Sequence, residues 1–305
     1  MPNLEQLFYT ILMRGIVQEI RTRVTAEEGG RLAVGYDLVL DDATSELSSW
    51  QGLVLRRVGD GLCRACQAPL AKGRAREGRE YCYDCFSTLA RCDLCVMSPD
   101  RCHFHLGTCR EPEWAQDSCM QPHTVYLALS HVPKVGITRQ GREWYRWADQ
   151  GAAQAMKLIS VPTRRMAGVL EAYLSQWVTD RTDWRKLVTG QKRPFDLMGL
   201  ATDLRHKSKA FVEFASDQTP SSETQRCLWL EDEPVYELEY PIRSFAPAEQ
   251  IRIEEQYEDQ LLGIVGGYLL LSQGVVATST LTRGDIEIER KDNVVLKEKP
   301  QMSLF

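Results

Sequence analysis

Cysteine is concentrated in one short stretch of this 305-residue chain, and this concentration constrains the fold more than any other feature. Nine of the ten cysteines lie between residues 63 and 119, and six of them form C-x2-C pairs: Cys63 with Cys66, Cys82 with Cys85, and Cys92 with Cys95. A C-x2-C turn places two thiolates along one edge of a zinc tetrahedron, and two such turns complete it. We therefore predict a multi-zinc module over residues 61–120, rather than a chance grouping of free thiols or a redox pair.

The first structural zinc ion is predicted at Cys63, Cys66, Cys82 and Cys85. Its role is expected to be folding, because a stretch of about 60 residues rich in Gly, Arg and Cys has too few aliphatic side chains for a core of its own. The tenth cysteine, Cys227, lies beside an apolar run and is predicted to be a core residue.

A second zinc ion is predicted where Cys92 and Cys95 begin the next part of the module. Its remaining ligands are expected among four residues: Cys102, His105, Cys109 and Cys119. The simplest completion is the Cys102-x2-His105 knuckle, which leaves the last two cysteines for a third ion, with His103 or His123 as further candidates. Two or three zinc ions are thus expected.

The composition is that of a globular protein, with 43% apolar and 26% charged residues. No stretch approaches the 18 or so uncharged apolar residues that a membrane span needs. The early run Leu4–Met13 is short, contains Glu5 and lacks a basic leader, so it is not expected to be a signal peptide. We expect a cytoplasmic protein with no membrane partner, in a compartment that keeps thiols reduced.

Charge is divided unevenly along the chain, although the net charge is only −5. Residues 131–193 contain twelve basic and five acidic side chains, a net of +7, whereas residues 212–260 contain three basic and thirteen acidic ones, a net of −10. This segregation favours one face that binds phosphate and another kept away from it. The candidate nucleic-acid-binding side chains of the basic stretch are Arg139, Arg142, Arg164 and Arg165. The alternative is two solvated faces without a partner.

Apolar periodicity predicts the elements on either side of the zinc module. Strands are predicted over residues 15–24, 31–40, 51–58, 234–240, 260–271 and 275–280, the last two interrupted by glycines. Residues 124–129 and 134–137 are predicted to form a hairpin, followed by helices over 142–151 and 164–178. Residues 218–224 are predicted to be a polar linker.

Four side chains on the hairpin and these helices suggest chemistry. Tyr126 lies on the first hairpin strand, Gly136 on the second, Arg146 on the first helix and Glu171 on the next. This order resembles the GIY-YIG nuclease superfamily, whose hairpin matches Val125–Leu127 and Lys134–Thr138. The resemblance implies that Tyr126 helps to activate a water, that Arg146 stabilises charge on the phosphate, and that Glu171 holds a divalent metal such as Mg²⁺ or Mn²⁺.

The chain departs from the superfamily pattern at two positions. Lys134 replaces the second tyrosine, and Gln150 replaces the histidine or tyrosine usually found four residues after the arginine. Tyr126 and a neutral Lys134 are therefore both candidates for the general base, so the predicted catalytic set is Tyr126, Lys134, Arg146 and Glu171. The alternative is a GIY-YIG fold that only binds nucleic acid, because function depends on sites rather than on folds.

Nearly the whole chain also resembles a bacterial family known only as a domain of unknown function (2797). The segments that carry this resemblance are Cys82–Cys85, Cys102–His105, Gly107–Pro112, Val125–Ala128, Lys134–Arg139, Arg146–Trp147, Asp149–Ala152 and Gly263–Leu271. Because that family name implies no activity, the resemblance predicts architecture and leaves function to the site.

The last five residues are a separate motif: Gln301, Met302, Ser303, Leu304 and Phe305. They resemble the pentapeptide that binds the bacterial DNA polymerase sliding clamp, Gln-Leu-Ser/Asp-Leu-Phe, with Met in place of the first Leu. A docking tail suits these side chains, because Gln can bond a pocket rim while Leu304 and Phe305 bury apolar area. The alternative is a terminus that packs on its own domain.

Together these features predict an α+β multidomain DNA-processing protein. The expected units are a β-rich segment (1–60), the multi-zinc module (61–120), a GIY-YIG-like α/β domain (121–215), an acidic linker with a β-rich segment (216–297) and a clamp-binding tail (298–305). The predicted function is a metal-dependent endonuclease for flap, fork or branched DNA, located at the nucleoid through the clamp. The alternatives are a non-catalytic clamp-associated adaptor and an RNA-directed zinc protein.

Overall fold

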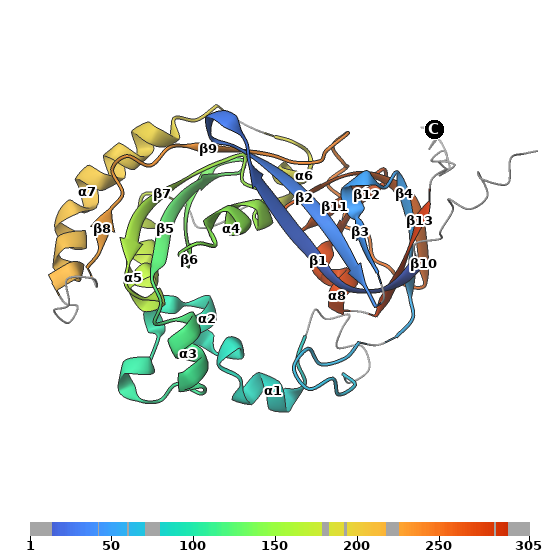
Figure 1. Cartoon of the computed structure of the whole chain (residues 1–305), viewed down its shortest axis with the longest axis horizontal. Helices are drawn as coiled ribbons and strands as arrows, with labels where there is room; N and C mark the ends of the chain where they lie inside the picture. The colour runs from blue at the N-terminus through green and yellow to red at the C-terminus, as the bar shows by residue number, and fades with distance from the viewer. Residues whose placement is uncertain are drawn as a thin grey trace, which may run out of the picture.

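The computed structural model describes residues 14–41, 43–59, 61–70, 80–178, 183–191, 194–217, 226–283 and 285–291. Over these residues the chain is a mixed α/β protein built around one thirteen-stranded sheet (Figure 1). Its strands are β1 (Arg14–Ala26), β2 (Arg31–Leu40), β3 (Thr44–Glu46), β4 (Gly52–Arg57), β5 (His123–Leu129), β6 (Pro133–Arg139), β7 (Gln154–Val161), β8 (Leu228–Trp229), β9 (Tyr236–Glu239), β10 (Gln256–Val265), β11 (Tyr268–Leu271), β12 (Gly274–Ala277) and β13 (Ile286–Lys291).

Most helices lie in the cysteine-rich stretch or against the part of the sheet that β5, β6 and β7 form. The α-helices are α1 (Tyr83–Thr88), α2 (Leu94–Met97), α3 (Pro112–Ser118), α4 (Glu143–Asp149), α5 (Arg164–Leu174), α6 (Trp184–Val188), α7 (Leu197–Asp217) and α8 (Thr278–Arg283). Short 3-10 turns are η2 (Glu28–Gly30), η3 (Leu47–Ser49), η4 (Ala90–Cys92), η5 (Pro99–Arg101) and η6 (Phe104–Leu106).

The predicted strands and helices are present, with three differences. The helix predicted over 164–178 ends at Leu174, and residues 260–271, expected to be one strand interrupted by glycines, form the end of β10 and all of β11, which pair antiparallel. Residues 275–280 were expected to be one strand, but β12 ends at Ala277 and α8 begins at Thr278. The helix turns Leu281 into the core, where it is fully buried. The predicted linker at 218–224 lies outside the described residues.

Strands from the N-terminal and C-terminal parts of the chain lie together in one half of the sheet. The strand order is β12-β11-β10-β4-β13-β1-β2-β9-β7-β5-β6, with β3 added to β2 and β8 to β7. The C-terminal strand β13 pairs with both N-terminal strands β4 and β1, and β2 pairs in parallel with β9. Strands predicted to lie in separate β-rich segments are therefore neighbours.

Strand β5 lies at the centre of the other half, and all seven of its residues are buried. Side chains alternate across the pleat, so Tyr126 and Ala128 face Trp147 of α4, while Val125 and Leu127 join the core beneath α5 and α7. Burial on both faces explains why this strand is a continuous apolar run instead of an alternating one. The hairpin is thus held between helices that follow it in sequence.

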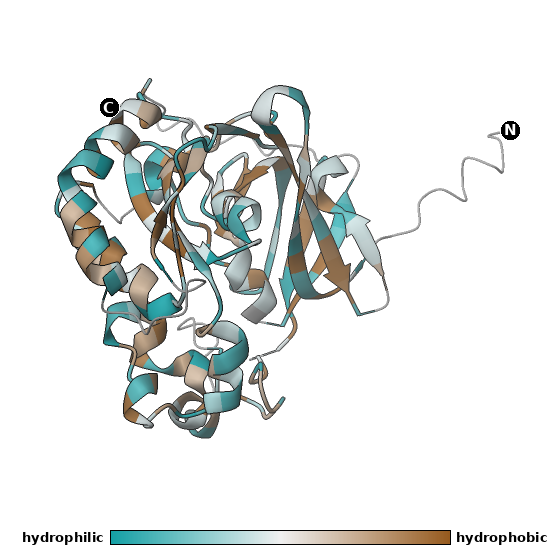
Figure 2. Ribbon diagram, turned by 60° about the vertical axis from the view of Figure 1, so that its left-hand side comes forward, coloured by the Kyte–Doolittle hydropathy of each residue, from teal (hydrophilic) through white to brown (hydrophobic). Residues whose placement is uncertain are grey.

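The C-terminal end of α4 also touches the β-rich half. Thr22 on β1 donates a hydrogen bond to the Asp149 carboxylate at 2.8 Å, and the Tyr240 hydroxyl donates to the Ala152 carbonyl at 2.9 Å. Figure 2 shows apolar residues gathered along the strands of both halves. No helix in the described part of the chain has both the length and the hydropathy that crossing a bilayer requires.

Candidate metal centre and arginine-lined pocket

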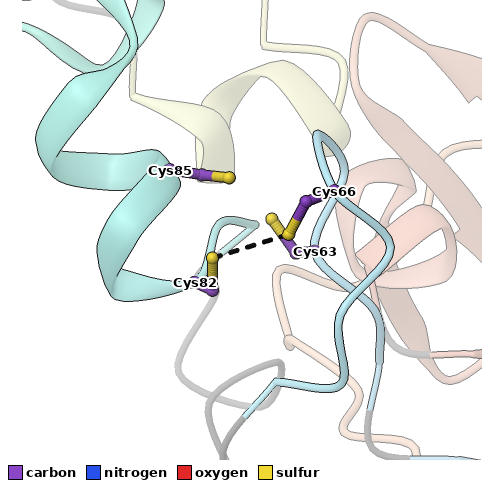
Figure 3. A group of neighbouring side chains, drawn as sticks. All are labelled: Cys63, Cys66, Cys82 and Cys85. Atoms are coloured by element: carbon purple, nitrogen blue, oxygen red, sulfur yellow. Dashed lines mark hydrogen bonds between the residues drawn. The ribbon is translucent and has the colours of Figure 1, made fainter.

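Four cysteines meet where the cysteine-rich stretch begins. The Sγ atoms of Cys63, Cys66, Cys82 and Cys85 all lie within 4.8 Å of one another (Figure 3). Cys66 and Cys82 have their Sγ atoms 3.7 Å apart. A zinc tetrahedron with Zn–S bonds of about 2.3 Å has edges of roughly 3.8 Å, so these cysteines fit a structural zinc site.

Local backbone geometry shapes this cluster. The Cys63 N–H donates to the Ala68 carbonyl at 2.8 Å, and the Gln67 N–H donates back to the Cys63 carbonyl at 2.9 Å. Cys82 caps the N-terminus of α1, and Cys85 lies in its first turn. Burial raises the pKa of Cys63, but backbone N–H groups, that of Cys66 first, lower it to about 6, which favours the thiolate that a metal requires.

The other predicted zinc ligands gather differently. In the described residues, one further group of ligand atoms lies within 4.8 Å, and it consists of Asp93, Cys95 and His103. Burial, followed by the charge of Asp93 and then those of Cys102, Cys119 and Cys109, raises the pKa of Cys95 to about 11.

Cys92 and His105 occupy other positions. Cys92 ends η4, and the charges that act on its thiol include those of Cys63 and Glu80. His105 is exposed on η6. The ligand sets proposed for a second and a third ion therefore stay predictions, because the described cysteines and histidines of residues 92–119 do not gather in the pairs that their spacing suggested.

The cysteine-rich stretch also forms one wall of a pocket of about 620 Å³. The opposite walls come from the β5–β6 hairpin, α4 and α5. The lining residues are Val96, Met97, Pro99, Trp114, Ser118, His123, Ile137, Thr138, Arg139, Arg142, Tyr145, Arg146, Asp149, Arg164 and Glu171. We call this cavity the arginine-lined pocket. It brings together three of the four predicted nucleic-acid-binding arginines, and Arg146 and Glu171 of the predicted catalytic set.

Several arginines of the pocket are held by fixed contacts. Arg164 donates to the Val96 carbonyl at 2.7 Å, and Arg139 donates to the Asp117 carbonyl at 3.1 Å. The Nε atom of Arg164 is buried and has no hydrogen-bond partner within the described structure. Arg142 lies over the Tyr145 ring, 4.9 Å from its centre. Contacts to carbonyl groups orient a guanidinium and leave its charge unneutralised.

Tyr126 lies beneath the pocket and is fully buried. Its hydroxyl donates to Gln150 Oε1 at 3.0 Å. Burial raises the pKa of Tyr126, so the phenol stays protonated near neutral pH. The ring lies against Gly136, where a Cβ would come within 2.6 Å of the Tyr126 hydroxyl. Glycine is therefore required on β6 for the tyrosine to occupy this position.

The remaining predicted residues lie elsewhere. Lys134 is buried on β6 opposite Ala128 and is not among the described residues that line the pocket. Arg165 is exposed on α5 and does not belong to that lining either. The five residues of the predicted clamp-binding motif, 301–305, lie outside the described residues.

The structure adds pocket residues that sequence reasoning did not identify. On α4, Tyr145 and Asp149 share the pocket with Arg142 and Arg146. Tyr145, Arg146 and Asp149 follow Arg142 by three, four and seven residues, a spacing that places all four on one face of a helix and that can be recognised in the sequence. Trp114 of α3 had no such signal, because its place in the wall depends on how the cysteine-rich stretch packs against α5.

The fold and the site define a mixed α/β protein in which four cysteines fit a structural zinc site and the later part of the cysteine-rich stretch lines an arginine-lined pocket. Residues 51–283 match the family described as protein of unknown function (DUF2797), and the chain belongs to this family. Comparison with curated proteins and with solved structures gave no match.

Proposed function

We propose that this protein is a metal-dependent endonuclease that cuts flap, fork or branched DNA. The observation that carries the proposal is the convergence of Arg146 and Glu171 on one pocket with Arg139, Arg142 and Arg164. Phosphodiester hydrolysis needs cations where charge develops on the phosphate and an oxygen ligand for a divalent ion. These residues supply both.

The arrangement of elements supports a likeness to GIY-YIG nucleases. Strand β5 lies between β6 and β7, helix α4 connects β6 to β7, and α5 follows β7. Tyr126 packs across Gly136 on the hairpin, while Arg146 and Glu171 reach the pocket from the two helices. The same four residues carried the resemblance in the sequence.

The geometry suggests a division of roles among these side chains. Arg146, whose positive charge acts on the Tyr126 hydroxyl, lines the pocket where a phosphate oxygen can meet it. The carboxylates of Glu171 and Asp149 are oxygen donors of the kind that Mg²⁺ or Mn²⁺ takes together with substrate phosphates. Such an ion supplies Lewis acidity at the scissile phosphate. Tyr126 acts in this proposal as a positioning residue for Arg146.

One observation favours the second candidate, a non-catalytic DNA-binding adaptor. Tyr126 is fully buried with its hydroxyl bonded to Gln150, and Lys134 occupies the position of the second tyrosine. A pocket rich in arginine can bind phosphate without a positioned base. The two candidates differ in whether any DNA is cut.

The test is cleavage of flap, fork, nicked and single-stranded DNA by the full-length protein with Mg²⁺ or Mn²⁺. Glu171→Ala should abolish cleavage and leave DNA binding nearly intact, whereas Glu213→Ala, an exposed carboxylate on α7, should cut as wild type does. Arg146→Ala should slow cleavage by about 10²-fold or more, with the exposed Arg252→Ala as its control.

The results separate the candidates. If Glu171→Ala and Arg146→Ala cut as fast as wild type, the assigned site is wrong. If wild type binds these substrates but cuts none of them, the adaptor is the better description.

The sliding clamp is proposed as a second partner from the sequence of residues 301–305 alone. The clamp would keep the protein at the nucleoid and raise its local concentration at a flap or primer end. Changing both Leu304 and Phe305 to Ala should weaken clamp binding by at least about a hundredfold, because each buried large side chain contributes roughly 1.5–3 kcal/mol. Equal clamp binding by full-length protein and by protein lacking these five residues would contradict this partner.

A further inference from the structure

We infer that the protein binds a second metal ion at Asp93, Cys95 and His103, a set that combines a carboxylate, a thiol and an imidazole. Their ligand atoms lie within 4.8 Å of one another, and all three residues are half-buried. Asp93 precedes the first turn of α2, Cys95 lies on that helix, and His103 precedes η6. Residues from two short helices, α2 and η6, thus converge on one point.

The hydrogen bonds of His103 indicate what its second ring nitrogen faces. The Thr108 hydroxyl donates to the His103 carbonyl at 3.3 Å, so it accepts from the ring Nδ1–H, which is 2.8 Å away. The other ring nitrogen, Nε2, lies 3.5 Å from Asp93 Oδ2, so an imidazole nitrogen and a carboxylate oxygen face the same point.

The position of Cys95 points to a metal ion, since its thiol converges with the carboxylate and the imidazole within 4.8 Å and all three groups are metal ligands in proteins. A metal-binding histidine commonly donates its other N–H to a neighbouring group, as His103 does to Thr108. Arg110 also contacts Asp93, at 2.8 Å and through the same Oδ2 atom that faces His103, and so fixes the orientation of the carboxylate.

Sulfur, nitrogen and oxygen ligands together favour zinc. Three protein ligands leave the fourth position of a zinc tetrahedron for water or for another side chain. This site is separate from the four-cysteine cluster, whose members come from residues 63–85. It uses Asp93 and His103 in place of Cys92 and His105.

An ion at this position would stabilise one wall of the arginine-lined pocket. Cys95 is followed by Val96, whose carbonyl accepts the hydrogen bond of the Arg164 guanidinium. Met97, on the same short helix, also lines the pocket. Helix α2 has only four residues, so it depends on such an external constraint to stay helical.

The test is the zinc content of the full-length protein, purified without chelators and measured by elemental analysis. We expect two zinc ions per chain in wild type and one in Cys95→Ser and in His103→Ala. His105→Ala is the matched control: it removes an exposed imidazole two residues further along and should keep both ions. One ion in wild type, two ions in His103→Ala, or equal loss in His105→Ala would each overturn the assignment.

A second measurement on wild type avoids variants that fail to fold. X-ray absorption at the zinc edge should show nitrogen or oxygen scatterers at about 2.0–2.1 Å besides sulfur at about 2.3 Å. A first shell of sulfur alone would overturn the site, since every ion would then be held by cysteines only.

Discussion

The sheet and the cysteine-rich stretch are two regions of one chain that are stabilised by different means. In the sheet, large side chains such as Trp50, Tyr36 and Leu55 are almost completely buried. In the cysteine-rich stretch, Tyr83 and Met97 are 78% and 83% exposed, and the cluster around the metal centre buries only Cys63 and Leu70. Apolar burial can account for the first region, but the second has too little of it, so we expect it to depend on metal coordination.

The largest expected effect comes from Cys63→Ser. Loss of one thiolate should release the zinc ion, which contributes on the order of 10 kcal/mol to a small zinc domain, and the cysteine-rich stretch should unfold while the sheet stays folded. Limited proteolysis and zinc analysis would measure this: new cleavage sites between residues 61 and 120, and loss of the four-cysteine ion together with the second ion proposed at Asp93, Cys95 and His103, which lie in the same stretch.

Cys227→Ser is the matched control for this substitution. Cys227 is buried in the core beneath α5 and α7 and lies far in sequence from the cluster. We expect a loss of about 1–3 kcal/mol in global stability with unchanged zinc content. A sheet that unfolds together with the cysteine-rich stretch in Cys63→Ser would show that the two regions are not independent.

A smaller effect is expected where the cysteine-rich stretch packs against α5. Gly168 on α5 faces η5, and a Cβ there would lie 2.6 Å from both the Asp100 backbone nitrogen and the Pro99 Cβ. Gly168→Ala should therefore cost about 1–3 kcal/mol and push the cysteine-rich stretch away from α5, with zinc retained. Urea unfolding and proteolysis would detect this. At Gly267 a Cβ would meet its nearest atom at 3.7 Å, so Gly267→Ala should be tolerated, and equal losses in both variants would contradict the close contact.

The smallest effect concerns pH and His123, which lies at the start of β5 in the pocket wall. Burial, with smaller contributions from Arg164 and Arg139, lowers the pKa of His123 to about 4. In the unfolded chain His123 binds a proton at its ordinary pKa of 6.5, whereas in the folded chain it stays neutral down to about pH 4. The free energy of unfolding therefore decreases as the pH falls through this range. Between pH 7 and pH 5.5 wild type should lose about 1 kcal/mol more than His123→Gln. The exposed His206→Gln is the control, and parallel pH curves for wild type and His123→Gln would refute the prediction.

Sequence periodicity predicted the sheet well where one face of a strand is buried. In β2 the buried and half-exposed residues alternate from Leu32 to Leu40, and the predicted bounds 31–40 match the structure. The long helix α7 carried a comparable signal, since its buried residues recur every three or four positions: Leu197, Ala201, Leu204, Ser208, Val212 and Ala215. That helix could have been predicted but was not.

The candidate site was predictable only in part, because spacing constrains neighbours and not distant contacts. The four cysteines of the first cluster follow from two C-x2-C turns, each a local structure. Cys92 and Cys95 have the same spacing, yet Cys92 is the last residue of η4 and Cys95 lies on α2. Their thiols therefore have different neighbours. The burial of Tyr126 depends on Trp147 and on helices far along the chain, which no local pattern encodes.

The position of β13 has a consequence for how the chain is made. β13 lies between β4 and β1, so these two N-terminal strands have no direct ladder with each other in the described sheet. β4 ends at Arg57 and β13 begins at Ile286, which leaves about 230 residues to be translated before the space can be filled. At roughly 5–20 residues per second, β1 and β4 expose unpaired edges on the ribosome for roughly 10–50 s. Throughout that interval the nascent chain offers strand edges that other chains can join.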